Sequence, residues 1–79
     1  MFCAYFLGNL ASQLGPAVCL ELGECMDVLS LLDELLRSRE VPLSVDELLV
    51  TLPDGRPIPP RATTCDVEEV RVLRLLRGG

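Results

Sequence analysis

The sequence contains four cysteines but no histidine and no lysine, so most nucleophile–base pairs cannot form from its side chains. Cys3, Cys19, Cys25 and Cys65 include no C-x-x-C pair, and their spacings differ from those of a zinc knuckle. We therefore expect no metal site and no catalytic residue in this chain. We interpret the cysteines as buried free thiols that pack as small apolar residues, because nothing else marks the chain as secreted. Disulfides are the alternative, and they also form in intracellular proteins from very hot habitats.

The second group able to do chemistry is the carboxylate that follows Gly78 and Gly79. Two residues without a Cβ pass extended through a slot too narrow for any other pair. An α-carboxylate has a pKa of about 3.5 and is anionic at neutral pH, so it can attack the α-phosphate of ATP. A thiol, sulfide or amine can then attack the resulting acyl-adenylate. The alternative is a frayed tail, but Leu73, Leu75 and Leu76 would reduce solubility unless a partner covered them.

Length and charge restrict the classes of protein that can present such an end. The 79 residues form one small domain, which lacks the depth for a water-excluded catalytic cavity, so we expect a protein that is not an enzyme. The net charge of −5 opposes binding to nucleic acid. The first twenty residues carry no charged side chain, but Asn9, Gln13 and Pro16 interrupt the apolar run and no basic residue precedes it. We therefore expect a cytoplasmic protein without a membrane segment.

The hydrophobic pattern indicates how the chain positions this end. Strands are predicted at 1–7 and 17–22, joined as an antiparallel hairpin, then at 47–52 and 67–76, with a short edge strand among the prolines of 57–60. A helix is predicted at 25–38, since Val28, Leu31, Leu32 and Leu35 recur at i, i+3, i+4 and i+7. The helix crossover requires a parallel strand pair. The expected fold class is α+β, with one main helix on a mixed sheet of four or five strands.

The last eight residues carry a resemblance to a known family. They read Val72-Leu73-Arg74-Leu75-Leu76-Arg77-Gly78-Gly79 and are similar to the tail of ubiquitin. The whole chain resembles the ubiquitin-like β-grasp proteins of the prokaryotic sulfur-carrier type, represented by the small subunit of molybdopterin synthase and by the thiamine-pathway sulfur carrier. Only the tail is specific to the family. The rest of the resemblance depends on the order of the remaining features along the chain. These features are the opening hairpin, the leucine-rich helix, the Pro53-Asp54-Gly55-Arg56 turn and the acidic segment 66–70.

The resemblance implies a β-grasp domain over 1–73 and a flexible C-terminal arm over 74–79. It implies that a ubiquitin-activating-type enzyme adenylates Gly79 with ATP, after which Gly79 becomes a thiocarboxylate or is joined to a target amine. The chain itself would bind no cofactor. Its partners would be the adenylating enzyme and then a sulfur acceptor enzyme or target proteins. The expected partner-binding residues are Leu73, Arg74, Leu75, Leu76 and Arg77.

Three alternatives remain at this point. Arg77 favours a protein modifier or dual-use carrier, whereas a dedicated small subunit of molybdopterin synthase usually has an apolar or small residue there. The chain also lacks the glycine that sulfur carriers commonly have before the last strand. An acyl carrier would use Ser30, but no aspartate precedes this serine, and Pro53 to Pro60 would break later helices. A β-grasp interaction domain with a silent tail is the third alternative.

Overall fold

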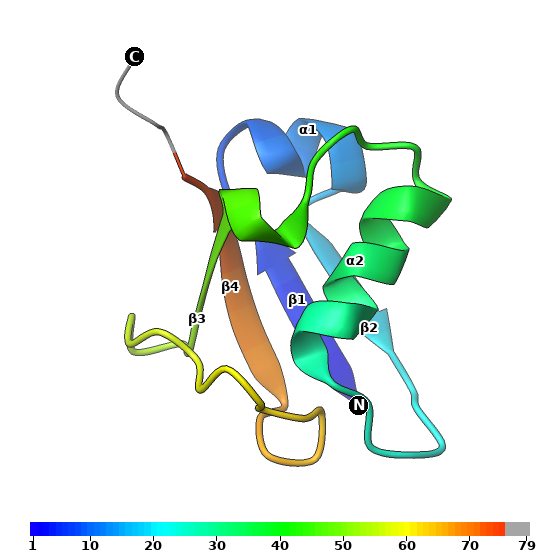
Figure 1. The fold of residues 1–79 in the computed structure, drawn as a ribbon, viewed down its shortest axis with the longest axis vertical. Coiled ribbons are helices and arrows are strands. Elements are labelled where there is room, and N and C mark those ends of the chain that lie inside the picture. The colour runs from blue at the N-terminus through cyan, green and yellow to red at the C-terminus, as the bar shows by residue number, and fades with distance from the viewer. Residues whose placement is uncertain (76–79) are drawn as a thin grey trace.

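The computed structural model of the protein describes residues 1–75 and has a mixed four-stranded sheet at its centre (Figure 1). Strand β1 pairs antiparallel with β2 and parallel with β4, and β4 pairs antiparallel with β3, giving the order β2-β1-β4-β3. The expected α+β class, with a mixed sheet and one main helix, is confirmed. The elements are β1 (Phe2–Phe6), α1 (Asn9–Leu14), β2 (Ala17–Leu20), α2 (Val28–Ser38), the 3-10 helix η1 (Val45–Glu47), β3 (Leu48–Thr51) and β4 (Glu69–Arg74).

The hydrophobic core lies between one face of the sheet and helix α2. Alternation along each strand directs every second side chain to this face, and α2 covers it with its leucine stripe (Figure 1). The core strand residues at this interface are Phe2, Ala4, Phe6, Leu48, Val50, Val70 and Val72, and the buried residues of α2 are Val28, Leu31, Leu32, Leu35 and Leu36.

Helix α2 confirms the predicted helix but begins three residues later. The side chain of Asp27 accepts a hydrogen bond from the backbone N–H of Ser30 at 3.0 Å, which satisfies a free amide at the helix N-terminus. Arg37 lies in the last turn, where the helix dipole favours a cation, and it also pairs with Asp33 at 3.1 Å. The capping residue therefore fixes the start that hydrophobic spacing alone did not locate.

The connection between β1 and β2 contains a helix that the sequence analysis did not predict. Helix α1 buries Leu10 and Leu14, which are four residues apart, against the core. Gly8 and Gly15 flank it with φ angles of 62° and 88°, a region that few other residues adopt readily. The expected antiparallel pairing of the first two strands is confirmed. The expected simple turn between them is wrong, because a short helix with two leucines can itself reach the core.

The proline-rich segment does not form the predicted fifth strand. It makes one isolated bridge, between Thr51 and Pro57, and the N–H of Ile58 donates to the carbonyl of Val50 at 3.1 Å. Each proline lacks the N–H that a ladder needs, so pairing does not continue. The tight turn before this segment is present, and there the backbone N–H of Arg56 lowers the pKa of Asp54 below its ordinary value.

The expectation of buried free thiols is wrong, because all four cysteines form disulfides. Cys3 lies directly opposite Cys19 in the antiparallel ladder, with Cα atoms 4.0 Å apart. The N–H of Cys3 donates to Glu68 on the other side, so Cys3 and Cys19 form a non-hydrogen-bonded pair, the kind in which facing side chains approach most closely. The sequence could not reveal this pairing before the strand register was known.

The second disulfide, Cys25–Cys65, joins the loop before α2 to the loop before β4. Hydrogen bonds hold these loops together, since Met26 N–H donates to Thr64 Oγ1 at 3.0 Å and Thr64 N–H donates to the Met26 carbonyl at 2.8 Å. Both cysteines are exposed rather than buried. The disulfide therefore closes a 40-residue stretch of chain at the surface.

The end of β4 defines where the described part of the chain stops. Arg74 is the last residue of β4, and the N–H of Leu75 donates to the carbonyl of Glu47 at 2.8 Å. The predicted arm thus begins with a residue that is still in the sheet, and its last four residues, 76–79, lie outside the described residues. No helix within residues 1–75 has the length and apolar character needed to span a membrane.

We expect Leu32→Ala to destabilise the domain by about 2–5 kcal/mol, because Leu32 is only 1% exposed and the change leaves a cavity under α2. Equilibrium urea unfolding followed by circular dichroism measures this. An unchanged free energy of unfolding would contradict the packing of α2 described above.

The two disulfides should differ in their contribution to stability. Loop-closure entropy predicts about 4 kcal/mol for Cys25–Cys65, which spans 40 residues, and about 3 kcal/mol for Cys3–Cys19, which spans 16. Urea unfolding of the two double cysteine-to-serine variants compares them directly. If neither variant lost stability, the bonds would not form in the folded protein.

Candidate functional site

The parallel pairing of β1 and β4 brings the carboxyl ends of both strands to one edge of the molecule. The N–H of Leu7 donates to the carbonyl of Val72 at 3.0 Å, so the chain leaving β1 lies beside the end of β4. A shallow hollow of about 260 Å³ forms there, lined by Leu7, Gly8, Asn9, Leu73 and Arg74. Strand pairing therefore presents the end of β4 next to an apolar depression.

Three of the expected partner-binding residues lie at this edge. Leu73 is half-buried and pairs with Leu49, Arg74 is exposed at the last position of β4, and Leu75 is 45% exposed. The structure thus brings Leu73, Arg74 and Leu75 together. The other expected residues, Leu76 and Arg77 with the activated Gly78 and Gly79, lie outside the described residues.

The sheet face away from α2 extends this apolar surface. Tyr5, Leu7 and Leu49 point to it and are 37%, 42% and 36% exposed. Helix α2 lies on the opposite face, and α1 contributes its leucines to the same core, so among the described elements no helix covers this one (Figure 1). We call it the open face, defined by Tyr5, Leu7, Leu49, Arg71 and Leu73.

The sequence analysis missed the first three residues of this surface. Tyr5 lies between the core residues Ala4 and Phe6, and Leu49 lies between Leu48 and Val50. Because neighbouring strand residues point to opposite faces, an apolar residue at every position predicts that both faces are apolar. The continuous apolar runs were taken to indicate strands, but not that both faces of these strands are apolar.

The last strand carries two arginines, Arg71 on the open face and Arg74 at the end of the strand. In residues 1–75 the ion pairs within 4 Å are Asp33–Arg37 and Asp54–Arg56, so neither Arg71 nor Arg74 has a carboxylate partner there. Arg71 lines a second hollow, of about 400 Å³, with Tyr5, Leu7 and Glu69. The open face is therefore apolar, with one acidic and one basic side chain, Glu69 and Arg71, beside its apolar residues.

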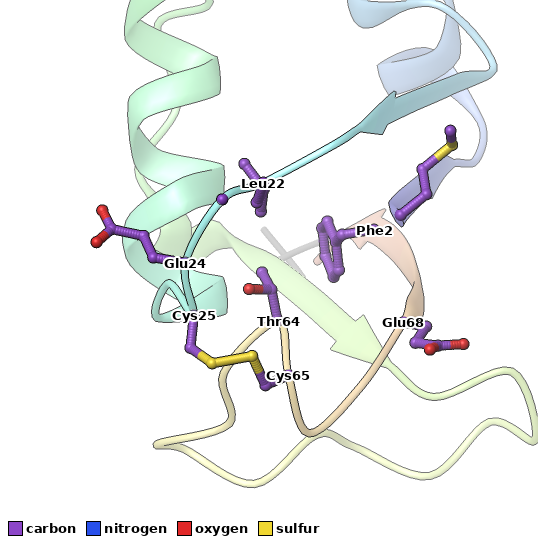
Figure 2. Close-up of a pocket in the computed structure, with 9 residues that line it drawn as sticks. Phe2, Leu22, Glu24, Cys25, Thr64, Cys65 and Glu68 are labelled. Carbon is purple, nitrogen blue, oxygen red and sulfur yellow. A yellow bond between two sulfur atoms is a disulfide. The ribbon is translucent and has the colours of Figure 1, made fainter.

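A third pocket, of about 390 Å³, lies at the opposite end of β1 and β4 (Figure 2). Figure 2 shows Phe2 and Leu22 at this pocket, the Cys25–Cys65 disulfide along its border, and the carboxylates of Glu24 and Glu68 on different sides. The sulfur atoms are already bonded to each other. In the described chain no group of three or more histidine, cysteine or acidic side chains is arranged to hold a metal ion. Among the described residues that line this pocket there is neither a free thiol nor a metal ligand set.

Comparisons with protein-family models, with curated proteins and with solved structures found no match for this chain. The residues at the end of β4 and on the open face are therefore the features that bear on function.

The open face predicts unequal effects for two neighbouring leucines of β3. Leu48 is 7% exposed in the core and Leu49 is 36% exposed on the open face. Leu48→Ala should cost about 2–5 kcal/mol, and Leu49→Ala no more than about 1 kcal/mol. Urea unfolding of both variants checks this, and equal losses would show that the strand does not alternate as described.

Proposed function

We propose that the protein is a ubiquitin-like small modifier or sulfur carrier whose C-terminal Gly79 is activated by a ubiquitin-activating-type enzyme. The observation that carries the proposal is the position of the last strand. β4 is an interior strand of the sheet and ends at Arg74, beside an apolar surface. Within residues 1–75, neither Arg71 nor Arg74 has a carboxylate within ion-pair distance. Four residues of sequence, ending in Gly78-Gly79, follow the last described residue.

The arrangement of the elements supports a β-grasp assignment. A mixed sheet with its first and last strands parallel at the centre, and one main helix packed on a single face, is compatible with the ubiquitin-like layout that the tail implies. Helix α1 and the absence of a regular fifth strand in residues 1–75 are compatible with it as local variations. The fold therefore supports the proposal without specifying the chemistry.

The proposed reaction uses the terminal carboxylate as a nucleophile. A carboxylate oxygen of Gly79 bonds to the α-phosphorus of ATP and pyrophosphate leaves, which gives an acyl-adenylate. A sulfur or amine nucleophile from the partner system then attacks the acyl carbon and AMP leaves. This chain would be the substrate in both steps and not the enzyme. ATP would be bound by the activating partner, and the chain would hold no cofactor of its own.

Docking to the activating enzyme would use Leu73, Arg74 and Leu75, followed by Leu76 and Arg77. The open face extends this surface with Tyr5, Leu7 and Leu49. Burial of these exposed apolar groups would supply affinity, and charge-assisted hydrogen bonds from the arginines would orient the end of the chain. Sulfur acceptor enzymes or target proteins would follow as later partners.

The open face also favours a second candidate function, a β-grasp interaction domain whose tail takes no part. An uncovered apolar face needs no activated carboxylate in order to bind a partner. Both candidates predict a docking surface, but only the first requires Gly79. The small subunit of molybdopterin synthase remains a narrower form of the first candidate, because it uses the same activated end.

We further propose a cytoplasmic location, because adenylation requires ATP. The two disulfides constrain this proposal, since cytosolic thiols are kept reduced in most organisms, although intracellular proteins of hyperthermophiles are an exception. Cells would be quenched in acid to stop thiol exchange, and the denatured protein would then be alkylated near neutral pH with and without prior reduction, which reveals the state of the cysteines. Disulfides present in the cytosolic fraction would agree with the proposed location and with the two disulfides of the structure.

We expect deletion of Gly79 to abolish ATP–pyrophosphate exchange with the activating enzyme while leaving the unfolding free energy unchanged. The shortened chain would no longer place its carboxylate in line with the α-phosphate. Because the rate of a reaction falls steeply when the reacting atoms are misplaced, adenylation would stop. Full exchange by the truncated chain would refute the assignment of Gly79, whereas the absence of exchange with the full chain would favour the interaction domain.

Charge reversal at the end of β4 should slow activation. We expect Arg74→Glu to reduce the rate of exchange at low salt by about tenfold, and high salt to reduce this difference. Arg61→Glu is the matched control, since Arg61 is equally exposed but precedes β4, away from its carboxyl end. Equal effects of the two variants would argue against docking through Arg74.

A further inference from the structure

We infer that the Cys25–Cys65 disulfide is a site of thiol–disulfide exchange for a small thiol that carries a cationic group. The bond borders the pocket at the amino ends of β1 and β4, whereas Arg74 and the tail lie at the carboxyl end of β4 (Figure 2). The exchange uses neither Gly79 nor the open face, so it is an activity beyond the one proposed above.

The exposure of the two cysteines makes this disulfide accessible to a nucleophile. Cys25 and Cys65 are both exposed and lie in loops. A thiolate must reach a disulfide sulfur directly, so attack from solvent is open at this bond. In the other disulfide, Cys3 is half-buried on an interior strand between β2 and β4. Attack at Cys19 would leave a thiolate at this less solvated position, so exchange there should be slower.

The loops that carry Cys25 and Cys65 have contacts that do not depend on the disulfide. Met26 and Thr64, the chain neighbours of the two cysteines, form two hydrogen bonds with each other, of 3.0 Å and 2.8 Å. The N–H of Val28 also donates to the carbonyl of Ala62 at 3.0 Å. These bonds would hold the two thiols side by side after reduction. The same pair can then close again, which makes the exchange reversible.

The charges around the pocket indicate the class of thiol. Glu24 and Glu68 line the pocket from different sides, and in residues 1–75 neither has a basic partner within ion-pair distance (Figure 2). The described lining contains no arginine, and its other charged group is the α-amine of Met1. The carboxylates would attract a cationic group on the thiol and repel an anionic one. The net charge of −5 acts in the same direction.

The size and the apolar lining of the pocket indicate the rest of the molecule. The volume of about 390 Å³ is that of a small-molecule site rather than of a protein interface. Phe2 and Leu22 supply apolar surface beside the disulfide (Figure 2). A short methylene chain between the sulfur and the cationic group would therefore be favoured.

The exchange proceeds in two steps that balance atoms and electrons. The small thiol loses a proton to solvent, and its thiolate attacks one sulfur of the Cys25–Cys65 bond. A mixed disulfide forms, while the other cysteine leaves with the bonding electron pair and takes up a proton. A second thiol attacks the mixed disulfide at the small-molecule sulfur, which releases a small disulfide and the second cysteine thiol. Two small thiols are oxidised for each protein disulfide that is reduced.

The test compares three thiols of equal chain length on the full, oxidised chain. Aminohexanethiol, mercaptohexanol and mercaptohexanoate differ in charge only at the end far from sulfur. Each rate is divided by the rate of the same thiol with bis(hydroxyethyl) disulfide, which corrects for differences in intrinsic reactivity. Rapid alkylation with excess maleimide stops the reaction, and peptide mass spectrometry assigns each rate to one of the two disulfides.

We expect aminohexanethiol to open Cys25–Cys65 at least about tenfold faster than Cys3–Cys19. At Cys25–Cys65 and low salt, the amine should react about threefold faster than the alcohol and the carboxylate about threefold slower, and high salt should reduce both differences. Equal or faster opening of Cys3–Cys19 would overturn the proposal. Equal corrected rates for the three thiols at Cys25–Cys65 would overturn it as well.

Glu68→Gln tests whether the charge preference comes from the pocket. This variant should reduce the advantage of the amine over the carboxylate about threefold. Glu34→Gln is the matched control, because it makes the same change of charge at an exposed residue of α2 that does not line the pocket. Equal effects of the two variants would assign the preference to the net charge of the chain and contradict a pocket site.

Reversibility and independence from the tail complete the test. After removal of the small thiol, bis(hydroxyethyl) disulfide should restore the Cys25–Cys65 pairing, and the circular dichroism spectrum should stay the same throughout. A lost spectrum or a different cysteine pairing would contradict loops that remain joined. Deletion of Gly79 should leave the exchange rates unchanged, so this activity and the proposed activation can fail separately. A slower exchange in that variant would contradict a separate site.

Discussion

The parallel pairing of the first and last strands is the constraint on which the rest of the structure depends. β1 and β4 lie side by side at the centre of the sheet, and Ala4, Val70 and Val72 between them have no exposed surface. Parallel neighbours need a crossover, which α2 provides while it covers the core face. This pairing leaves the other face open and brings Leu7 to the end of β4, where the candidate site lies.

The same constraint leaves the small domain with two surfaces of different character. The open face and the end of β4 are apolar and carry Glu69, Arg71 and Arg74, while the pocket at the other end of β1 and β4 is bordered by the Cys25–Cys65 disulfide and by carboxylates. One disulfide links β1 to β2, and the other links the loops that precede α2 and β4. They stabilise the scaffold without supplying a free thiol. In this account the domain presents a reactive end, and the chemistry of its side chains is limited to exchange at Cys25–Cys65.

Much of the fold could be predicted from local patterns, and what was missed depends on contacts between distant residues. The spacing of Val28, Leu31, Leu32 and Leu35 predicted α2. Short apolar runs bounded by turn residues, two of them alternating, predicted the four strands. Helix α1 was missed because one turn is too short to show a helical period. The disulfides were missed because strand register joins Cys3 to Cys19, and loop pairing joins Cys25 to Cys65.

The candidate site was predictable only in part for a related reason. The apolar and basic character of Leu73, Arg74 and Leu75 is visible in the sequence, and the structure brings these residues together. The contribution of Tyr5 and Leu7 depends on β1 lying beside β4, which no local pattern specifies. The chemistry proposed for Gly79 rests on the tail sequence alone, because Gly79 lies outside the described residues.

Intact mass spectrometry tests the central claim most directly. The purified full chain would be incubated with its adenylating enzyme, ATP and a sulfide donor, and its mass compared with that of a reaction lacking ATP. The account predicts an ATP-dependent change of one oxygen to one sulfur, mapped by fragmentation to Gly79. An unchanged mass, in a reaction where the enzyme activates another carrier protein, would contradict it.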